Sequence, residues 1–231
     1  PQNTLFGRGS QIGAIHFISR SAVNSTEGYA TAGIGTYGRR EFRGALNVPV
    51  VKDKLFLRAA GVVDFRDGFV ENTFGGTLNG KNTVAGRFSV RFLPSANHKL
   101  DLVVNYQKDD TPGVAFMSGQ FPNTAGDTGI FTYRASLEQG KNLRTGKELF
   151  DVTLNYRYTI NEHTYWTSIT SYRKVISSAR WDGDGTAAPA IDMWEDAGAE
   201  QFYQEFRYNF SINSRMHGSA GASYWHENAN N

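Results

Sequence analysis

The sequence predicts an all-β protein and, more narrowly, part of an antiparallel transmembrane β-barrel with about nine strands. Three observations predict this fold. Apolar and polar residues alternate with a period of two over most of the chain. Short and long connections alternate along the chain, and aromatic residues gather beside both kinds of connection.

Composition limits the classes of function. The 231 residues include no cysteine, which excludes a disulfide scaffold and thiolate metal sites. The net charge of +2 indicates no nucleic-acid partner. Hydrophobic residues make up 39% of the chain, and no apolar run approaches the roughly 18 residues of a membrane helix. A barrel wall needs apolar residues on only one face of each strand, so this composition is compatible with a membrane protein.

The alternating segments predict nine strands, and no helical period of useful length accompanies them. We expect strands at 27–37, 41–48, 55–66, 84–92, 100–107, 151–158, 163–179, 202–210 and 216–225.

Connection lengths favour an outer-membrane barrel over a soluble β-sandwich. Short turns are expected at 51–54, 93–99, 160–163 and 212–215. Longer loops are expected at 67–81, 109–148 and 181–198. Growth of the loops on one side only is typical of outer-membrane barrels, whereas a sandwich does not require it.

The alternation also predicts which residues face lipid and which face the barrel lumen. Aromatic residues beside the short turns, such as Phe92 and Phe210, and toward the long loops, such as Phe65 and Tyr106, fit two interfacial girdles. We expect lipid contacts from Leu57, Val90, Val104 and Leu154. We expect lumen positions for Arg58, Arg91, Asn105 and Asn155.

One glycine motif points to a nucleotide site, but its context does not. Gly33, Gly35 and Gly38 have the G-x-G-x-x-G spacing of dinucleotide-binding proteins. Such a site needs a helix directly after the motif, so that the helix N-terminus meets the pyrophosphate. An alternating strand follows here instead, so a glycine-rich strand and its turn are predicted, without a cofactor.

Metal and catalytic signals are weak. Asp182, Asp184 and Asp192 are candidates for a calcium site in a loop, although the spacing fails the helix-loop-helix pattern and a flexible acidic turn is the alternative. The five histidines are scattered. No G-x-S-x-G motif or paired-acid arrangement occurs, so an enzyme is not predicted.

The long loops carry the candidate substrate-binding residues. Aromatic side chains on external loops suit the capture of a bulky amphiphilic ligand by stacking, with charged groups setting its orientation. The alternative is that they pack the loops together or contact a partner protein, such as a surface lipoprotein. The candidates are Phe116, Met117, Phe121, Phe131, Tyr133, Arg134, Trp181 and Trp194.

The first twenty residues resemble the end of the plug domain of TonB-dependent outer-membrane receptors. The family pattern there is P-Q-x-x-L-[FY]-G-R, then small residues, a double glycine, an apolar strand and a basic residue. Ile12-Gly13-Ala14 and His16 depart from it. Later segments resemble family strands as well: 167–173, 204–207 and 224–227. The matching positions of the plug motif are Pro1, Gln2, Leu5, Phe6, Gly7, Arg8, Gly13, Ile15, Ile18 and Arg20.

This resemblance implies a domain organisation and a function. Residues 1–22 would be the C-terminal end of a plug, and residues 23–231 the N-terminal part of a barrel that has 22 strands in the family. We expect the native chain to continue past Asn231, because lipid does not tolerate unpaired strand edges. Receptors of this family take up ferric siderophores, haem, cobalamin or glycans through the Gram-negative outer membrane, and TonB, bound upstream of Pro1, supplies the energy. A passive porin or adhesin, and a soluble carbohydrate-binding β-sandwich, are the alternatives.

Overall fold

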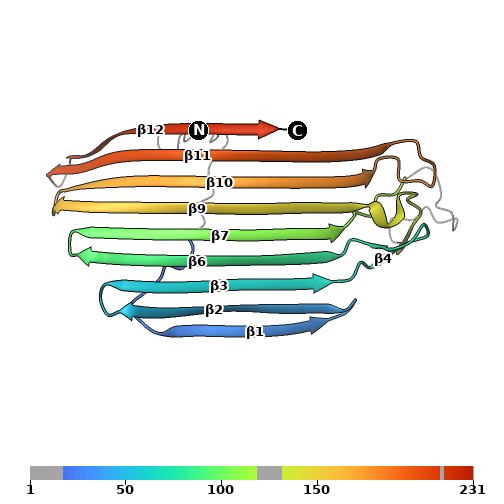
Figure 1. The fold of residues 1–231 in the computed structure, drawn as a ribbon, viewed down its shortest axis with the longest axis horizontal. Helices are drawn as coiled ribbons and strands as arrows, with labels where there is room; N and C mark the ends of the chain where they lie inside the picture. The colour runs from blue at the N-terminus through green and yellow to red at the C-terminus, as the bar shows by residue number, and fades with distance from the viewer. Residues whose placement is uncertain (1–17, 119–131, 214–215, 231) are drawn as a thin grey trace.

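The computed structural model describes residues 18–118, 132–213 and 216–230. Nine long strands form one antiparallel sheet, in which each strand pairs with its neighbours in chain order (Figure 1). Among the described residues, none belongs to a helix that is long and apolar enough to cross a membrane. The nine strands are β1 (Glu27–Gly35), β2 (Arg39–Val51), β3 (Leu55–Arg66), β6 (Lys81–Ser95), β7 (His98–Pro112), β9 (Arg144–Asn161), β10 (Thr164–Asp182), β11 (Asp192–Asn213) and β12 (Met216–Asn230).

Smaller elements lie in the connections at one end of the sheet. Two loops contain the short strands β4 (Val70–Asn72), β5 (Thr77–Leu78) and β8 (Arg134–Ala135) and the 3-10 helix η1 (Gly140–Asn142). They gather at the right-hand end of the sheet in Figure 1, where the long connections lie. The four predicted short turns lie at the opposite end, and the tight β1–β2 turn is at the loop end, so the longer loops are confirmed to lie on one side only.

The nine predicted strands are all present, and the glycine motif closes a hairpin. The first strand ends at Gly35 rather than at the predicted residue 37. Tyr37 and Gly38 both have positive φ (57° and 63°), which is the type I′ turn that joins twisted antiparallel strands. Strand β2 follows at once, so the prediction that this motif is a strand and its turn is confirmed.

Several strands run further toward the long loops than their alternation predicts. The loop expected at 181–198 is shorter, because β10 continues to Asp182 and β11 already begins at Asp192. Lys174 on β10 pairs with Glu200 on β11 at 2.7 Å next to this extension. Charged and aromatic residues, such as Asp196 and Trp194, share one side of this extension, so the period-two signal fades although the backbone pairing continues.

The two faces of the sheet differ in chemistry. Leu57 pairs with Val90, Val90 with Leu102, and Leu102 with Leu154. Because directly paired residues point to the same side of a sheet, these side chains share one face, here called the apolar face. By the same rule Arg91, Asp101 and Asn155 share the other, here called the polar face. The predicted division of the alternating residues between two faces is therefore confirmed.

Large hydrophobic side chains on the apolar face are exposed. Phe42, Phe88 and Phe206 have relative exposures of 54%, 43% and 55%. A continuous apolar surface of this extent on a water-soluble protein would be an association site. Such a surface is also typical of the outer wall of a transmembrane barrel.

The aromatic border of the apolar face steps along the sheet. Tyr106 on β7 pairs with Phe150 on β9, and both lie where the apolar residues give way to charged ones. On β11 the corresponding aromatic residue is Phe202, which pairs with Tyr172 on β10. Tyr172 in turn pairs with Val152 on β9. The border at β11 is therefore level with Val152, which lies two residues closer to the short turns than Phe150. Strands that are tilted against a membrane plane produce this shift, because the lipid boundary then crosses the strand register obliquely.

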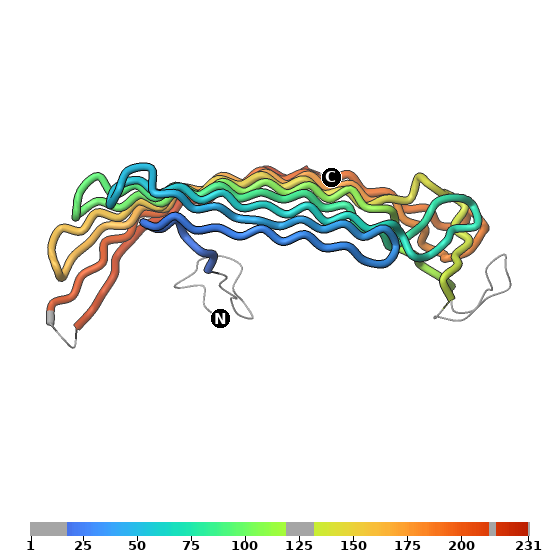
Figure 2. Tube along the Cα trace, turned by 90° about the horizontal axis from the view of Figure 1, so that it is seen from below, coloured from blue at the N-terminus to red at the C-terminus, as the bar shows by residue number. Residues whose placement is uncertain are grey.

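The segment that leads into β1 lies against the polar face. In Figure 2 it lies below the sheet, close to the short-turn end of β2. Ala22 is 1% exposed, and Asn47 on β2 binds the backbone of Val23. Arg20 pairs with Glu27 at 2.7 Å. The polar face therefore already carries a packed segment of the same chain.

Candidate functional site

The two longest loops form one unit, here called the loop cluster, made of residues 67–80, 113–118 and 132–143. Strand β4 is the centre of a three-stranded sheet with β5 on one side and β8 on the other. The β4–β8 pairing is parallel and joins Glu71 to Arg134 and Asn72 to Ala135. Segments that lie more than sixty residues apart in the sequence are thus held side by side.

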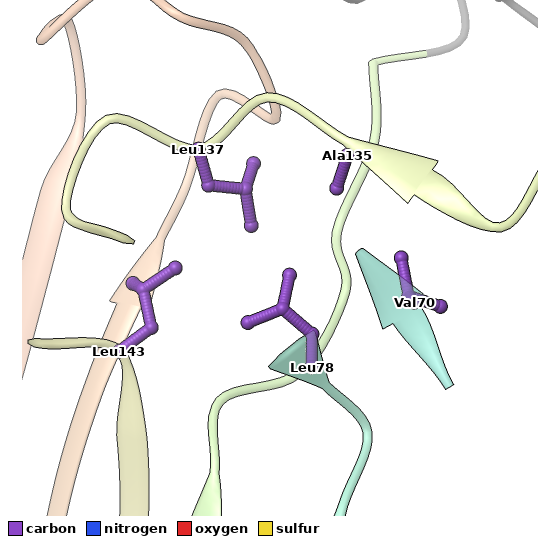
Figure 3. Packing of buried hydrophobic residues seen from close by; sticks show 5 residues of the cluster. All are labelled: Val70, Leu78, Ala135, Leu137 and Leu143. Atoms are coloured by element: carbon purple, nitrogen blue, oxygen red, sulfur yellow. The ribbon is translucent and has the colours of Figure 1, made fainter. Parts of the chain in front are cut away.

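The loop cluster contains the compact hydrophobic core of the described chain. Its five buried members come from both loops and point toward one another (Figure 3). Phe69, Ala115 and Met117 pack against this core. Full burial of a leucine contributes roughly 1.5–3 kcal/mol, so this core can hold the loops in a fixed arrangement. The buried members are Val70, Leu78, Ala135, Leu137 and Leu143.

Asn72 joins the two loops with polar contacts. It is 3% exposed, and its Nδ2 donates to the carbonyl of Leu137 at 2.8 Å. Its Oδ1 accepts from the N–H of Leu137 at 2.9 Å. The buried amide is satisfied by the neighbouring loop, so its hydrogen bonds depend on the docked arrangement.

An aromatic hollow of about 360 Å³ opens on the loop cluster. The ring of Phe69 lies 5.9 Å from that of Tyr37 and 6.4 Å, edge on, from that of Tyr133. The guanidinium of Arg66 lies 5.2 Å from the centre of the Phe69 ring. Rings combined with a cation suit a flat, electron-rich ligand group. The hollow is lined by Phe69, Val70, Asn79, Ala115, Met117, Thr132 and Tyr133.

A second hollow, of about 530 Å³, lies beside the first and is more basic. Four cationic side chains line it, compared with two acidic ones. One acid, Asp110, pairs with a cation, Arg144, at 3.3 Å. Arg66 also donates from Nη2 to the carbonyl of Asn79 at 2.8 Å, which fixes it between the two hollows. The charged lining residues are Arg66, Lys81, Lys141, Arg144, Asp67 and Asp110.

The connection between β10 and β11 packs against the loop cluster. The N–H of Ser118 donates to the carbonyl of Gly185 at 3.1 Å, and Gln139 donates to Asp192 at 2.7 Å. These contacts bring the loop that was expected at 181–198 to the same site as the loop that was expected at 109–148.

Two of the three aspartates proposed for calcium, Asp182 and Asp184, accept hydrogen bonds from backbone groups. Asp182 accepts from the N–H groups of Asp184 and Gly185 at 3.1 and 2.6 Å. Asp184 accepts from Thr186 and, at 2.9 Å, from the N–H of Ile191. A hydrogen bond from the Thr186 hydroxyl is the main reason that the pKa of Asp184 lies below its ordinary value. Within residues 18–118, 132–213 and 216–230, no group of three or more His, Cys, Asp or Glu side chains is placed to hold a metal ion.

Glu138 is the most perturbed titratable group of the loop cluster. Both of its carboxylate oxygens are buried. Burial raises the pKa of Glu138 to about 7, and the neighbouring carboxylates of Asp182 and Asp192 contribute to the increase. Near neutral pH, this side chain is therefore divided between its neutral and charged forms.

The predicted substrate-binding residues separate into groups. Met117 and Tyr133 line the aromatic hollow, whereas Phe116 is 51% exposed nearby in the chain. Arg134 lies on β8, 3.8 Å from Glu71. Phe121 and Phe131 lie outside the described residues.

The two tryptophans do not form one site. Trp181 pairs with Met193 across the β10–β11 hairpin, so Trp194, the next residue, points to the opposite face. Trp181 lies on the same side of the sheet as the polar face. Trp194, which is 75% exposed, lies on the same side as the apolar face. The register therefore does not bring these two side chains together.

Phe69, which lines the aromatic hollow, was not among the predicted site residues, nor were Tyr37 and Arg66, which contact its ring. They belong to a hairpin turn, the end of a strand and the shorter loop. The dipeptide Gly68-Phe69 offered the only sequence signal, an aromatic residue in a glycine-rich loop. Only the pairing of β4 with β8 shows that Phe69 and Tyr133 lie together.

Comparison with known proteins identifies the fold. No family model matches the sequence. The structure is similar to the ferric yersiniabactin uptake receptor FyuA from Yersinia pestis, with 16% identity and a TM-score of 0.83 over 99% of this chain and 35% of that receptor. The ferric-catecholate import receptor Fiu from E. coli K12 gives 14% identity and a TM-score of 0.74, with 99% and 38% covered. The siderophore receptor PiuA from Acinetobacter baumannii gives 14% identity and a TM-score of 0.74, over 98% of this chain and 34% of that receptor.

The chain thus spans between 34% and 38% of the length of these three receptors. Its nine-stranded sheet has the fold of the barrel region of TonB-dependent receptors. The resemblance that the sequence suggested is confirmed at the level of the fold.

Proposed function

We propose that this chain forms part of the wall and the external loops of a TonB-coupled receptor in the outer membrane of a Gram-negative bacterium, and that the receptor imports a ferric chelate. The observation that carries the proposal is the likeness to three receptors described as taking up ferric or siderophore ligands, which extends over at least 98% of this chain. A likeness of this extent includes the loops as well as the strands.

The chemistry of the two faces supports a place in the membrane. Exposed rings such as Phe88 and Phe206 suit lipid, and the aromatic border through Tyr106 and Phe202 suits a membrane interface. The polar face would then line the lumen. Residues 18–22, packed near Asn47, suit the end of a plug that enters the lumen from the short-turn side.

The loop cluster would capture the ligand at the external surface. Its aromatic hollow suits planar iron-binding groups, and the adjoining basic hollow suits a negative charge. Haem, cobalamin and glycans are the alternative substrates. A ferric chelate is favoured over them because the similar receptors are described as taking up ferric ligands. TonB would act on residues outside those that the structure describes.

Uptake of labelled iron tests this function. A strain that lacks the gene should lose import of one or more ferric chelates and regain it with the gene restored. Deletion of tonB, or collapse of the proton gradient, should abolish the same import. Import that continues without energy would support the passive porin instead. Recovery of the protein from the soluble fraction, without detergent, would support the carbohydrate-binding module.

A further inference from the structure

A third cavity, of about 710 Å³, lies on the polar face of the sheet, where β2, β3, β6 and β7 run side by side. We call it the polar-face groove. Small side chains, including Ala60 and Ala85, form part of its lining, and charged side chains rise around them. Its volume falls within the range of small-molecule sites. The charged lining residues are Arg39, Glu41, Arg43, Asp64, Lys81, Arg87 and Asp151.

Three cations share two carboxylates at the end of the groove that is nearer the loops. Arg39 contacts both acids, with distances of 2.9 Å to Glu41 and 3.2 Å to Asp64. Lys81 lies 2.7 Å from Asp64, and Arg43 pairs with Glu41. This network therefore has one more positive than negative charge.

The cations, not the acids, form the surface of this network. The side chain of Asp64 is 5% exposed and that of Glu41 is 14% exposed. The side chains of Arg39, Arg43 and Lys81 are 43%, 53% and 46% exposed. A ligand that enters the groove consequently meets guanidinium and ammonium groups, while the carboxylates beneath them hold those groups in position.

A fourth cation continues this arrangement further along the groove. Arg87 donates from Nε to the side-chain oxygen of Asn105 at 2.5 Å, and Asn105 in turn donates to Asp151 at 3.1 Å. The neutral amide thus stands between the guanidinium and the carboxylate. The positive charge of Arg87 is oriented by Asn105 without being cancelled by direct contact with Asp151.

The groove connects to the candidate capture site. Lys81 lines both the polar-face groove and the basic hollow of the loop cluster. Cationic groups therefore continue from the loops onto the polar face along β3 and β6. A series of positive charges arranged in this way raises the local concentration of anions and guides their entry.

We propose that the polar-face groove is a binding site for the negatively charged part of the substrate, so that the receptor selects ferric chelates with net negative charge over neutral ones. This inference rests on the proposed function and adds the charge class of the substrate. The acceptor oxygens would be carboxylates or catecholates of the chelate, bound by Arg43 and Arg39 and then by Arg87.

Uptake and binding of two probes by the intact receptor test this inference. The probes are a ferric tris-catecholate, which is anionic, and a ferric trihydroxamate, which is neutral. Arg43→Gln should lower the affinity for the anionic probe roughly tenfold at low salt, with a smaller loss at high salt, and leave the neutral probe unchanged. Arg43→Lys keeps the charge, so its affinity for the anionic probe should stay close to that of the unmodified receptor.

Lys99→Gln is the matched control. Lys99 lies on the same face, is 43% exposed and also pairs with a carboxylate, that of Asp101 at 3.2 Å, but it is not part of the groove lining. It should bind both probes normally. Equal losses for both probes in Arg43→Gln, or an equal loss in Lys99→Gln, would show a general structural effect and overturn the groove assignment.

The two proposals fail in different ways. If the unmodified receptor imports the neutral probe and not the anionic one, the inference is overturned and receptor function stands. If Arg43→Gln folds and imports the anionic probe normally, the inference is likewise overturned. If no ferric chelate is imported in an energy-dependent way, the proposed function itself fails, and the groove assignment fails with it.

Discussion

Asn47 on β2 holds Val23, at the entry to the first strand, through both backbone groups of that residue. The side-chain oxygen of Asn47 accepts from the Val23 N–H at 3.0 Å, and its Nδ2 donates to the Val23 carbonyl at 2.8 Å. Nδ2 also donates to the carbonyl of Ser25 at 2.5 Å. Asn47 is fully buried, so these bonds have no competition from water. The segment that follows the proposed plug is thereby fixed to the wall.

Asn47→Ala should release residues 22–26 from the wall. Loss of these bonds and the unpaired backbone groups left behind should cost about 2–3 kcal/mol of local stability. Asn47→Asp should be at least as damaging, because a carboxylate cannot donate to the two carbonyls and would be buried beside them. Hydrogen exchange of the Ala22–Ser25 amides in the intact receptor measures the effect. Asn97→Ala, at the exposed β6–β7 turn, is the control, and equal protection in all three variants would contradict this role.

A charge on the apolar face should impair assembly much more than the same charge on the polar face. Val90 lies between Leu57 and Leu102 on the apolar face, whereas Asn155 pairs with Asp101 on the polar face. Val90→Arg should cost roughly 2–4 kcal/mol if this residue meets lipid near mid-bilayer. Asn155→Arg gains a carboxylate neighbour and should be tolerated. The fraction of heat-modifiable, folded barrel in the outer membrane measures both variants, and equal yields would mean that the faces are assigned wrongly.

Glu138 should make the loop cluster less stable as the pH rises from about 4.5 to above 7. Its pKa is raised from 4.5 to about 7 in the folded chain, so the folded state holds a proton that the unfolded state has already released in this range. Stability falls with pH wherever the folded state binds more protons, here by at most about 3 kcal/mol. Hydrogen exchange of the 135–143 amides at pH 5 and pH 8, corrected for intrinsic rates, should show this loss. Glu138→Gln should remove most of the difference, and an unchanged pH dependence would refute the assignment.

The wall of the protein was predictable from the sequence because strands with one apolar and one polar face impose a strict period of two. Val90 and Arg91 could be assigned to opposite faces without a structure, and all nine strands were found. Above the apolar band this constraint ends, so the continuation of β10 to Asp182 and the start of β11 at Asp192 carried no such signal.

The candidate site was less predictable because it depends on contacts between loops. Aromatic residues indicated that the loop expected at 109–148 is functional, yet they could not show that Tyr133 meets Phe69 or that Trp181 and Trp194 face apart. The aspartates of the 182–192 turn suggested a metal from composition alone. In the structure Asp182 and Asp184 accept hydrogen bonds from backbone N–H groups, a use that sequence spacing does not distinguish from ligation.

Two substitutions should separate the architecture of the loop cluster from its proposed role in capture. Leu137 is fully buried in the core, so Leu137→Ala should cost about 2–5 kcal/mol and loosen both loops. Tyr133 is 64% exposed beside the aromatic hollow, so Tyr133→Ala should leave the core intact.

If the hollow captures the ligand, Tyr133→Ala should weaken chelate binding about tenfold by removing a stacking surface, with no change in amide protection at Leu78 or Leu143. Leu137→Ala should reduce both binding and protection. Tyr133→Phe keeps the ring and should bind normally, which distinguishes stacking from a role of the hydroxyl. Titration of the intact receptor with a ferric chelate, followed by fluorescence quenching, supplies the affinities. Normal affinity in Tyr133→Ala would exclude this side of the hollow from ligand capture and leave the aromatic residues a purely structural role.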